Sequence, residues 1–496
     1  MRILFLHPIN LYRRWPVPVD FVRFGYNPPA VTYPQLAACL PPGHPCALID
    51  GIVEKADVGK LTRQVRDSDV VALNSYHPGA SLNTELNIRL IRKIKPEIKI
   101  VMGGMHPTFF AEEWIERGVD FVVRGEGENT FCELIDRLES GDDLQDVRGI
   151  SYRSDGRTIH NPDREPIKDL DTLPMPRWDL AEMSRYGNRS SDRITATMET
   201  SRGCAYQCDF CVIPYHWKGP QRYKSVERTI DELLYLKKLG VRKLWVADNT
   251  FGNNQARDME LLEQMLRHDL KINWYCFARV DTILEHPEFY RLASRAGLEC
   301  ALVGFETLNE EKLATLNKGY RKRLVLDDYR RAYRTLKGSS IFTVGLLMVG
   351  FPGDSRKDVA ETMTEYGQIC DFPFLSPLRP ERGTPLYGEF QDKQDQELFY
   401  YDAQIKYADF ERFKAQWVYL TVRSFMRPAP KLILGNRFER HYYQDFYKHL
   451  LMGIAGFNIH NLIDFLYLAV IYRDGICYED YRRHIVGRYR NWIDRR

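Results

Sequence analysis

Three of the ten cysteines fall within eight residues, and their spacing is the first feature that suggests chemistry. Cys204, Cys208 and Cys211 stand on a loop that follows a strand-like segment. Thiolates bind zinc and iron–sulfur clusters. Three thiolates on one loop can hold three irons of a cubane cluster and leave the fourth iron open to a substrate or cofactor. Alternatively, His216 could complete a four-ligand zinc site, although zinc knuckles usually carry a second cysteine pair.

The other seven cysteines are dispersed along the chain, and we expect them to be core residues. Ten cysteines among 496 residues are too few for a disulfide scaffold. Hydrophobic residues make up 44% of the chain and charged residues 28%, which is typical of globular proteins. The net charge is only +3, so the composition gives no reason to expect a nucleic-acid partner.

The chain shows no sign of a targeting or membrane-spanning segment. Its first apolar run, residues 3–6, is too short for the core of a signal peptide. No stretch reaches the roughly 18 apolar residues that a membrane-spanning helix needs, and the nearest candidate, residues 462–472, contains Asp464. We therefore expect a cytoplasmic protein with reduced thiols, in which clustered cysteines indicate metal binding or catalysis.

Residues 1–140 alternate short apolar runs with amphipathic helical stretches, which predicts an α/β domain with a doubly wound, Rossmann-type parallel sheet. Ligands of such sheets bind at the carboxyl ends of the strands, where small residues let a large flat ligand approach the backbone. The candidate binding residues at these ends are Asn74, Ser75, Gly103, Gly104, His106, Gly125, Glu126 and Gly127.

Residues 141–190 are expected to form a hairpin followed by a linker. Two short strand-like segments flank Asp155 and Gly156, a dipeptide typical of a hairpin turn. The remainder is rich in proline and lacks clear periodicity, so we interpret it as an ordered linker.

The β-α alternation returns in residues 191–390, where six strand-like runs predict a partial (β/α)6 barrel. Active sites of barrels lie at the carboxyl ends of the strands, and the cysteine loop follows the first of them. Residues 391–496 are rich in Tyr, Phe, Arg and Lys at helical spacing, which predicts a helical C-terminal domain.

The cysteine spacing resembles the signature of radical S-adenosylmethionine (radical SAM) enzymes. The resemblance implies that Cys204, Cys208 and Cys211 bind a [4Fe-4S] cluster whose open iron chelates the amino and carboxylate groups of S-adenosylmethionine. One electron would then cleave a carbon–sulfur bond, giving a 5′-deoxyadenosyl radical that abstracts hydrogen from the substrate. The resemblance also implies an electron donor such as flavodoxin or ferredoxin.

Segments at the ends of later barrel strands resemble the same family in the family's order. Asp248 follows the second strand, and the resemblance implies that its segment lies near the cofactor. Arg279 at the third strand would bind the cofactor carboxylate by a paired contact. Glu306 at the fourth would accept hydrogen bonds from the ribose hydroxyls or the amino group, and Gly350 and Pro352 belong to the turn that lines the adenine. Any one of them could instead be an ordinary charged residue or turn residue at a strand end.

The glycine-rich strand ends of the first domain resemble the cobalamin-binding domain of the cobalamin-dependent radical SAM subgroup, which implies cobalamin as a further cofactor. Methionine-synthase-like domains carry a cobalt-ligating histidine in Asp-x-His-x-x-Gly, and the matching region after Asp50 has none. Many members of the radical subgroup also lack it and hold cobalamin without a lower protein ligand. His7, His77 and His106 stand near strand ends, either beside the corrin or as ordinary polar loop residues.

The resemblance implies a cobalamin-dependent radical SAM methyltransferase that acts on an unactivated carbon of a small-molecule substrate. Two alternatives stay open. One is a cyclase or ring-rearranging enzyme of tetrapyrrole or lipid-like substrates, in the branch of the anaerobic magnesium-protoporphyrin monomethyl ester cyclase. The other is a non-catalytic iron–sulfur or corrinoid-binding protein.

The motifs single out no catalytic acid or base, and no residue identifies the substrate. Aromatic and basic residues of the C-terminal region, such as Trp417 and Arg437, would suit a lid over a flat or hydrophobic substrate. An ordinary helical core explains them more simply.

Overall fold

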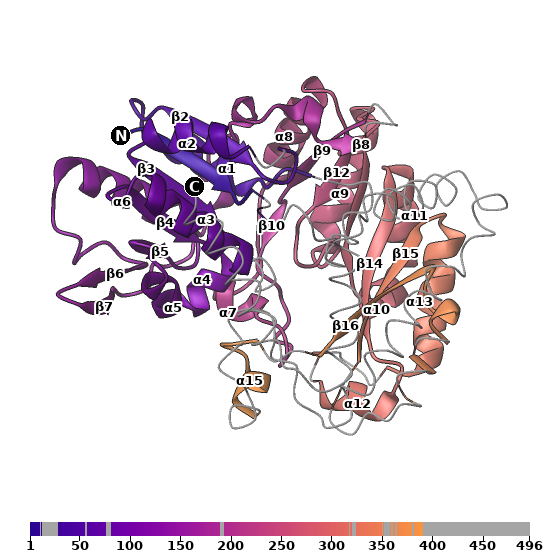
Figure 1. The fold of residues 1–496 in the computed structure, drawn as a ribbon. Coiled ribbons are helices and arrows are strands. Elements are labelled where there is room, and N and C mark those ends of the chain that lie inside the picture. The colour runs from indigo at the N-terminus through magenta and orange to yellow at the C-terminus, as the bar shows by residue number, and fades with distance from the viewer. Residues whose placement is uncertain are drawn as a thin grey trace, which may run out of the picture.

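The computed structural model describes residues 1–9, 11, 28–54, 57–75, 81–188, 193–316, 318–319, 324–349, 351, 358, 361–362, 365–378 and 381–389. Within these residues the chain forms two α/β halves, each built on a seven-stranded sheet (Figure 1). The predicted helical region 391–496 lies outside the described residues, as do Gly350, Pro352 and His77.

The first sheet has the strand order β2-β1-β3-β4-β5-β6-β7, and its first five strands are parallel. The order 2-1-3-4-5 is that of a doubly wound fold, in which ligands bind at the carboxyl edge. The predicted Rossmann-type sheet is therefore confirmed. The parallel strands are β1 (Ile3–His7), β2 (Cys46–Asp50), β3 (Val70–Asn74), β4 (Lys99–Gly103) and β5 (Phe121–Val123).

Helices cover both faces of this sheet because successive residues of each buried strand point to opposite sides. One core contains Leu4 and Leu6 of β1 together with residues of α2 (Val58–Arg66), α3 (Ser81–Ile94) and α5 (Ala111–Glu116). The other contains Ile3 and Phe5 together with residues of α1 (Thr32–Cys39) and α6 (Glu128–Ser140). The short helix α4 (Met105–Phe109) follows β4 at the carboxyl edge.

A hairpin extends the first sheet. Strands β6 (Ile150–Ser154) and β7 (Arg157–His160) are antiparallel, and β6 pairs with β5. Asp155 and Gly156 have φ angles of 49° and 76°, the left-handed pair that a tight hairpin turn requires. The sheet thus continues past residue 140, while the predicted domain limits remain predictions. Residues 161–186 follow with three 3₁₀ turns, Leu170–Thr172, Trp178–Leu180 and Met183–Arg185.

The second sheet has six parallel strands, and β8 (Gly187–Asn188) pairs antiparallel at one edge. Its order β16-β15-β14-β13-β12-β9-β8 leaves two different edge strands that do not pair with each other, so the sheet is an open barrel, as predicted. The parallel strands are β9 (Arg193–Met198), β12 (Val241–Val246), β13 (Asn273–Ala278), β14 (Leu298–Glu306), β15 (Phe342–Val349) and β16 (Phe372–Pro377).

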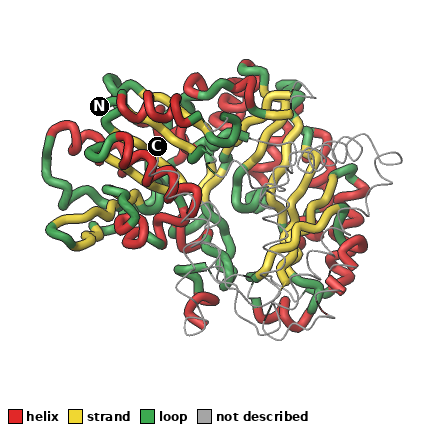
Figure 2. The backbone as a smooth tube through the Cα atoms, viewed as in Figure 1, coloured by secondary structure: helices red, strands yellow, loops and turns green. Residues whose placement is uncertain are grey.

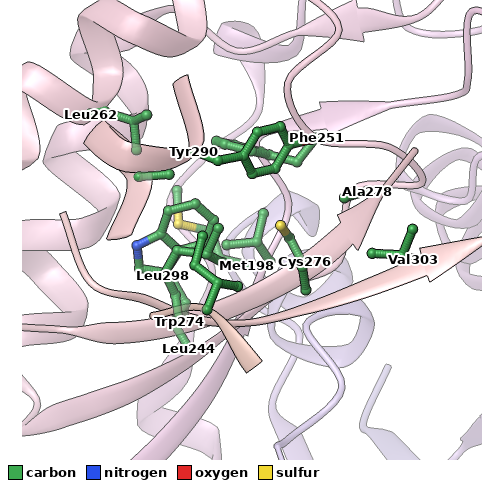
Figure 3. Packing of buried hydrophobic residues seen from close by; sticks show 14 of the residues in the cluster. Met198, Leu244, Phe251, Leu262, Trp274, Cys276, Ala278, Tyr290, Leu298 and Val303 are labelled. Carbon is green, nitrogen blue, oxygen red and sulfur yellow. The ribbon is translucent and has the colours of Figure 1, made fainter. Parts of the chain in front are cut away.

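Helices pack on the outer face of this barrel (Figure 2). Figure 3 shows their core with the strands, in which Leu244, Trp274 and Cys276 meet Leu262 and Tyr290. The helices are α8 (Val226–Lys238), α9 (Gln255–Arg267), α10 (Val280–Glu285), α11 (Pro287–Arg295) and α13 (Leu326–Gly338), with a 3₁₀ turn at Tyr366–Gln368. Helix α12 (Glu310–Thr315) follows the carboxyl end of β14.

Three small elements lie between the halves or join them (Figure 1). Strands β10 (Ser201–Arg202) and β11 (Arg222–Tyr223) form a two-stranded antiparallel ribbon. Helix α7 (Ile213–Trp217) lies between them in the sequence. Helix α15 (Pro385–Glu389) comes after β16. None of the described helices is long and apolar enough to cross a membrane.

Candidate functional site

The three clustered cysteines lie on the loop between β10 and α7, at the carboxyl end of the barrel. All three are free thiols. The loop begins at Gly203, whose φ of +85° favours glycine. Cys204 Sγ lies 3.4 Å from the Thr250 hydroxyl, and Cys208 Sγ lies 3.8 Å from the Lys318 carbonyl oxygen. The loop is therefore fastened to the segments after β12 and α12.

The three thiols do not converge on one point, as the ligands of a zinc ion would. Zinc needs its ligands around one atom, at about 2.0–2.3 Å, and no three His, Cys, Asp or Glu side chains in the described part of the chain converge in that way. In a cubane, each thiolate binds a different iron. Burial raises the pKa of the Cys208 thiol, and it raises the pKa of Cys211 to about 12. His216 lines another cavity, described below.

Asp248 holds the start of the cysteine loop. Its carboxylate is almost fully buried and accepts four hydrogen bonds, from the backbone N–H and the hydroxyl of both Thr200 and Ser201, at 2.6–3.1 Å. Both carboxylate oxygens are thus engaged by the residues that lead into the loop. The structure gives Asp248 a positioning role, and its contact with a cofactor remains a prediction.

Glu306 ends β14 in an unusual backbone conformation. Its φ is +65°, and the pairing of β14 with β15 shifts register between Gly304 and Glu306. Bulges and left-handed non-glycine residues often mark sites where a side chain is aimed for function. The carboxylate lies 2.8 Å from the Lys318 ammonium, which also donates to the Gly304 carbonyl at 2.6 Å. A side chain at Gly304 would come within 2.5 Å of the Glu306 carboxylate.

Arg279 lies in the same cluster, beside the cysteine loop. Its guanidinium donates to both carboxylate oxygens of Asp281, at 3.0 and 2.9 Å, and to the Lys318 carbonyl at 3.0 Å. It also stacks 3.4 Å from the centre of the Tyr206 ring, inside the cysteine motif. The structure therefore brings Arg279 and Glu306 together near Cys208, and it adds Lys318. Sequence analysis missed Lys318, because a lysine before a glycine is too common to indicate a site.

A cavity lies at the carboxyl edge of the first sheet, where the glycine-rich strand ends were predicted to bind a ligand. Apolar residues of the sheet, α1 and α6 form part of its wall, including Val101, Leu36 and Phe131. The predicted residues that line it are Asn74, Gly103, Gly104, Gly125, Glu126 and Gly127. The barrel half contributes Glu199, Arg202, His216 and Trp217.

The strand ends at this cavity have the features of a cradle for a large ligand. Gly104 has a φ of +103°, and a side chain there would come within 2.3 Å of the Asn74 amide oxygen. Gly125 has a φ of +71°, with nothing within 4 Å of a side chain built on it. The Asn74 amide oxygen, which lines the cavity, is buried and meets no hydrogen-bond partner among the described residues; the same holds for the hydroxyl of Ser75, which follows it in sequence but does not line the cavity. An apolar wall with small residues and unsatisfied polar atoms fits a flat cofactor such as cobalamin.

The candidate histidines of this half are placed differently. His106 is buried and stacks on Phe110, with ring centres 4.4 Å apart, and its Nδ1 accepts a hydrogen bond from the Trp114 indole at 2.9 Å. Neither His106 nor Ser75 is among the residues that line the cavity. His7 ends β1, with its Nδ1 3.7 Å from the Asp50 carboxylate.

Arg202 joins the two halves through a buried ion cluster. Its guanidinium lies 2.9 Å from Glu126, 2.5 Å from Glu128 and 3.0 Å from Glu199. Burial opposes ionisation of Glu128, but the Arg202 charge outweighs it, so the pKa of this carboxyl is lowered. Burial raises the pKa of Glu199 despite the same neighbour. Because Arg202 stands two residues before Cys204, this cluster ties the cradle to the cysteine loop.

Glu126 was predicted to bind a cofactor, and its carboxylate is instead largely engaged by protein. Besides Arg202, it binds Arg222 at 2.8 Å and accepts the Ile167 backbone N–H at 2.7 Å. The partners lie far away in sequence, so the strand-end pattern could not reveal them. A contact between Glu126 and a cofactor remains a prediction.

Two known protein families match this chain, one in each α/β half. Residues 198–365 match the Radical SAM superfamily, and residues 19–135 match the B12 binding domain. The first match begins at the last residue of β9 and contains all three clustered cysteines. The second contains the strand ends that form the cradle.

Two relatives are each similar to 73% of this chain. A protein of Pyrococcus horikoshii, named as an uncharacterized methyltransferase, is 29% identical over 371 residues, which are 73% of this chain and 78% of the relative. The anaerobic magnesium-protoporphyrin IX monomethyl ester cyclase of Rubrivivax gelatinosus is 28% identical over 376 residues, which are 73% of this chain and 65% of the cyclase.

Among solved structures, the cobalamin-dependent S-adenosylmethionine radical enzyme OxsB with aqua-cobalamin bound superposes with a TM-score of 0.67. The match covers 95% of this chain and 76% of that chain, at 19% sequence identity. At this identity the likeness establishes the shared fold alone.

Proposed function

We propose that this chain, which belongs to the radical SAM superfamily and carries a B12-binding domain ahead of its radical SAM domain, transfers a methyl group to an unactivated carbon of a small-molecule substrate. The observation that carries the proposal is the shared edge. The glycine cradle and the elements that flank the cysteine loop contribute to one cavity: β10 supplies Arg202, and α7 supplies His216 and Trp217. A radical site and a methyl donor must lie close together for such a reaction.

The cofactors of this family are a [4Fe-4S] cluster, S-adenosylmethionine and cobalamin; when bound, they supply a hydrogen-abstracting radical and a methyl group. The chain's own residues hold and orient them. Cys204, Cys208 and Cys211 would ligate the cluster, and Arg279 and Glu306 would bind the polar groups of S-adenosylmethionine. Gly104 and Gly125 let a flat ring approach the backbone, and Arg202 fixes the distance between the two sites.

Aromatic side chains of the barrel favour a substrate with a flat or hydrophobic part. Leu244 and Trp274 point outward into the helix-packed core, so Trp245, Tyr275 and Phe277, next to them in sequence on β12 and β13, point to the other side of the sheet. These three residues are only half-buried, and their rings form a cluster. The centre of the Trp245 ring lies 4.7 Å from that of Tyr275 and 5.0 Å from that of Phe277. Such rings would contact an apolar or aromatic substrate and exclude water from a radical.

Methyl transfer is distinguished by its products. The full chain, reconstituted anaerobically with iron, sulfide and cobalamin, should convert S-adenosylmethionine to both S-adenosylhomocysteine and 5′-deoxyadenosine when a substrate and an electron donor such as flavodoxin or ferredoxin are supplied. S-adenosylhomocysteine marks the donation of a methyl group, and 5′-deoxyadenosine marks hydrogen abstraction. Candidate substrates should include flat hydrophobic molecules.

The Rubrivivax relative favours a second candidate, cyclisation or rearrangement of a tetrapyrrole-like substrate. This reaction would yield 5′-deoxyadenosine without S-adenosylhomocysteine. The predicted non-catalytic alternative is not supported, because the superfamily match and the methyltransferase relative indicate an enzyme.

A further inference from the structure

Helix α7 links the cysteine loop to the cradle. It starts two residues after Cys211, and its last two residues, His216 and Trp217, line the cavity at the edge of the first sheet. The helix belongs in sequence to the radical SAM half, while the cavity that it lines belongs to the B12-binding half. Figure 1 shows α7 at the junction between the halves.

His216 is buried without a hydrogen-bond partner that would explain its position. Only 5% of the residue is exposed, and its Nδ1 meets no partner in the described part of the chain. Burial lowers the pKa of the imidazole to about 4, so the ring is neutral near pH 7. A neutral imidazole has one N–H donor and one acceptor nitrogen. Keeping it buried and unsatisfied costs stability, which selection tolerates most readily at binding sites.

Trp217 lines the same cavity and, like His216, has a buried polar atom without a described hydrogen-bond partner. Its indole N–H is buried and also lacks a partner among the described residues. The ring meets His216 edge-on, with centres 5.1 Å apart, and the Arg202 guanidinium lies 5.5 Å from its centre. These contacts hold both rings in place, so their unused polar atoms are preorganised.

The chemistry of the cavity indicates the kind of group that would satisfy them. The Asn74 amide oxygen, another lining residue, is also buried without a described partner. The unsatisfied atoms of all three residues are neutral donors and acceptors. The charges nearby are paired with one another: Arg202 and Arg222 lie against the carboxylates of Glu126 and Glu128. The best-matched ligand therefore carries neutral polar groups, such as carboxamides, on a large apolar body, and the corrin ring of cobalamin has this character.

We propose that α7 is a corrinoid-binding element contributed by the radical SAM half, in which His216 and Trp217 hydrogen-bond neutral amide groups of cobalamin. The inference rests on the proposed function and deepens it by naming residues that recognise the cofactor from the cluster side. Cobalamin would thereby contact the helix that directly follows the cluster ligands.

The test compares cobalamin binding by the reconstituted full chain and three variants. His216→Phe and Trp217→Phe keep an aromatic ring and remove the polar atoms. Thr343→Val is the matched control, because the Thr343 hydroxyl in β15 is also buried without a described partner, yet it does not line the cavity. The dissociation constant for hydroxocobalamin is measured by visible absorption, and the thermal midpoint is measured without cobalamin.

We expect His216→Phe to weaken cobalamin binding at least tenfold and Trp217→Phe about fivefold, while Thr343→Val changes it less than twofold. In the absence of cobalamin, His216→Phe should melt at the same temperature as the wild type or higher, which a purely structural role would not produce. If His216→Phe fails to fold, Trp217→Phe decides alone.

Dissociation constants within twofold of the wild type for every variant that folds would overturn the inference and leave the proposed function intact. A wild-type chain that binds its cluster but not hydroxocobalamin would overturn both.

Discussion

At the carboxyl edge of the first sheet, the side chains of Asn74 and Ser75 have buried polar atoms without hydrogen-bond partners among the described residues. At the carboxyl edge of the barrel, by contrast, the carboxylate of Asp248 accepts hydrogen bonds from the protein, and that of Glu306 forms an ion pair with Lys318. The first edge is shaped by glycines and an apolar wall. The second is shaped by charges that fix one another. The difference indicates that the cradle is completed by its ligand, while the barrel edge is already preorganised to position the cysteine loop.

The cluster ligands give the largest expected effect and test whether the two edges are independent. Cys208→Ala should abolish the brown absorption of the cluster and the cleavage of S-adenosylmethionine, because a cubane needs all three thiolates. Cobalamin binding should persist, since Cys208 is not among the residues that line the cavity. Iron content, visible spectra and cobalamin titration check the three outcomes.

The control for Cys208→Ala is Cys370→Ala. Cys370 is also buried, with 1% exposure, but it lies in the core of the barrel. This variant should keep cluster, cleavage and cobalamin binding nearly intact. Loss of cobalamin binding in Cys208→Ala alone would show that the cradle depends on the cluster, which contradicts the independence of the edges.

A glycine of the cradle gives the next largest effect. Gly104→Ala should lower the free energy of unfolding by about 3 kcal/mol, because the new methyl group would meet a backbone carbonyl and a left-handed φ would be strained. The obstacles are the Ser75 carbonyl at 2.7 Å and the Asn74 amide at 2.3 Å. Cobalamin affinity should fall as well. Urea unfolding under anaerobic conditions measures the stability change.

Gly125→Ala provides the comparison for Gly104→Ala. Gly125 also has a positive φ, but no atom lies within 4 Å of the added carbon. Only the backbone strain remains, so the loss should be about 1 kcal/mol. Equal losses in both variants would mean that close packing does not shape the cradle.

The pH dependence of the free energy of unfolding tests whether the imidazole of His216 is buried in its neutral form. Its pKa is lowered from 6.5 to about 4 in the folded protein, so between these values the unfolded chain binds more protons and stability falls as the pH falls. At pH 5 the loss relative to pH 7.5 should be about 2 kcal/mol. His216→Phe should lack this part of the acid sensitivity. Unfolding free energies of both proteins at the two pH values give the difference, and an unchanged difference would contradict a buried neutral imidazole.

The sequence predicted what depends on local patterns. Strand positions and the open barrel follow from short apolar runs, and the cysteine loop follows from spacing within eight residues. The Arg202 cluster could not be predicted, because Glu128 lies 74 residues away and the strand order that joins them is a property of the fold. For the same reason Glu126 looked like a cofactor ligand, and Lys318 and Trp217 went unnoticed.

The smallest expected effect comes from making the same glycine-to-alanine substitution at the barrel edge that Gly104→Ala makes at the edge of the first sheet. Gly304→Ala places a methyl group 2.5 Å from the Glu306 carboxylate and 2.9 Å from the Lys318 ammonium. These are the ends of side chains, which can shift, and Gly304 has no left-handed strain, so the stability loss should be only about 1 kcal/mol. The displaced carboxylate should weaken S-adenosylmethionine binding about tenfold, which corresponds to about 1.4 kcal/mol. Equilibrium dialysis with S-adenosylmethionine, beside urea unfolding, measures both quantities. A Gly304→Ala chain that loses as much stability as Gly104→Ala while binding S-adenosylmethionine normally would reverse the contrast, because shape rather than charge would then govern the barrel edge.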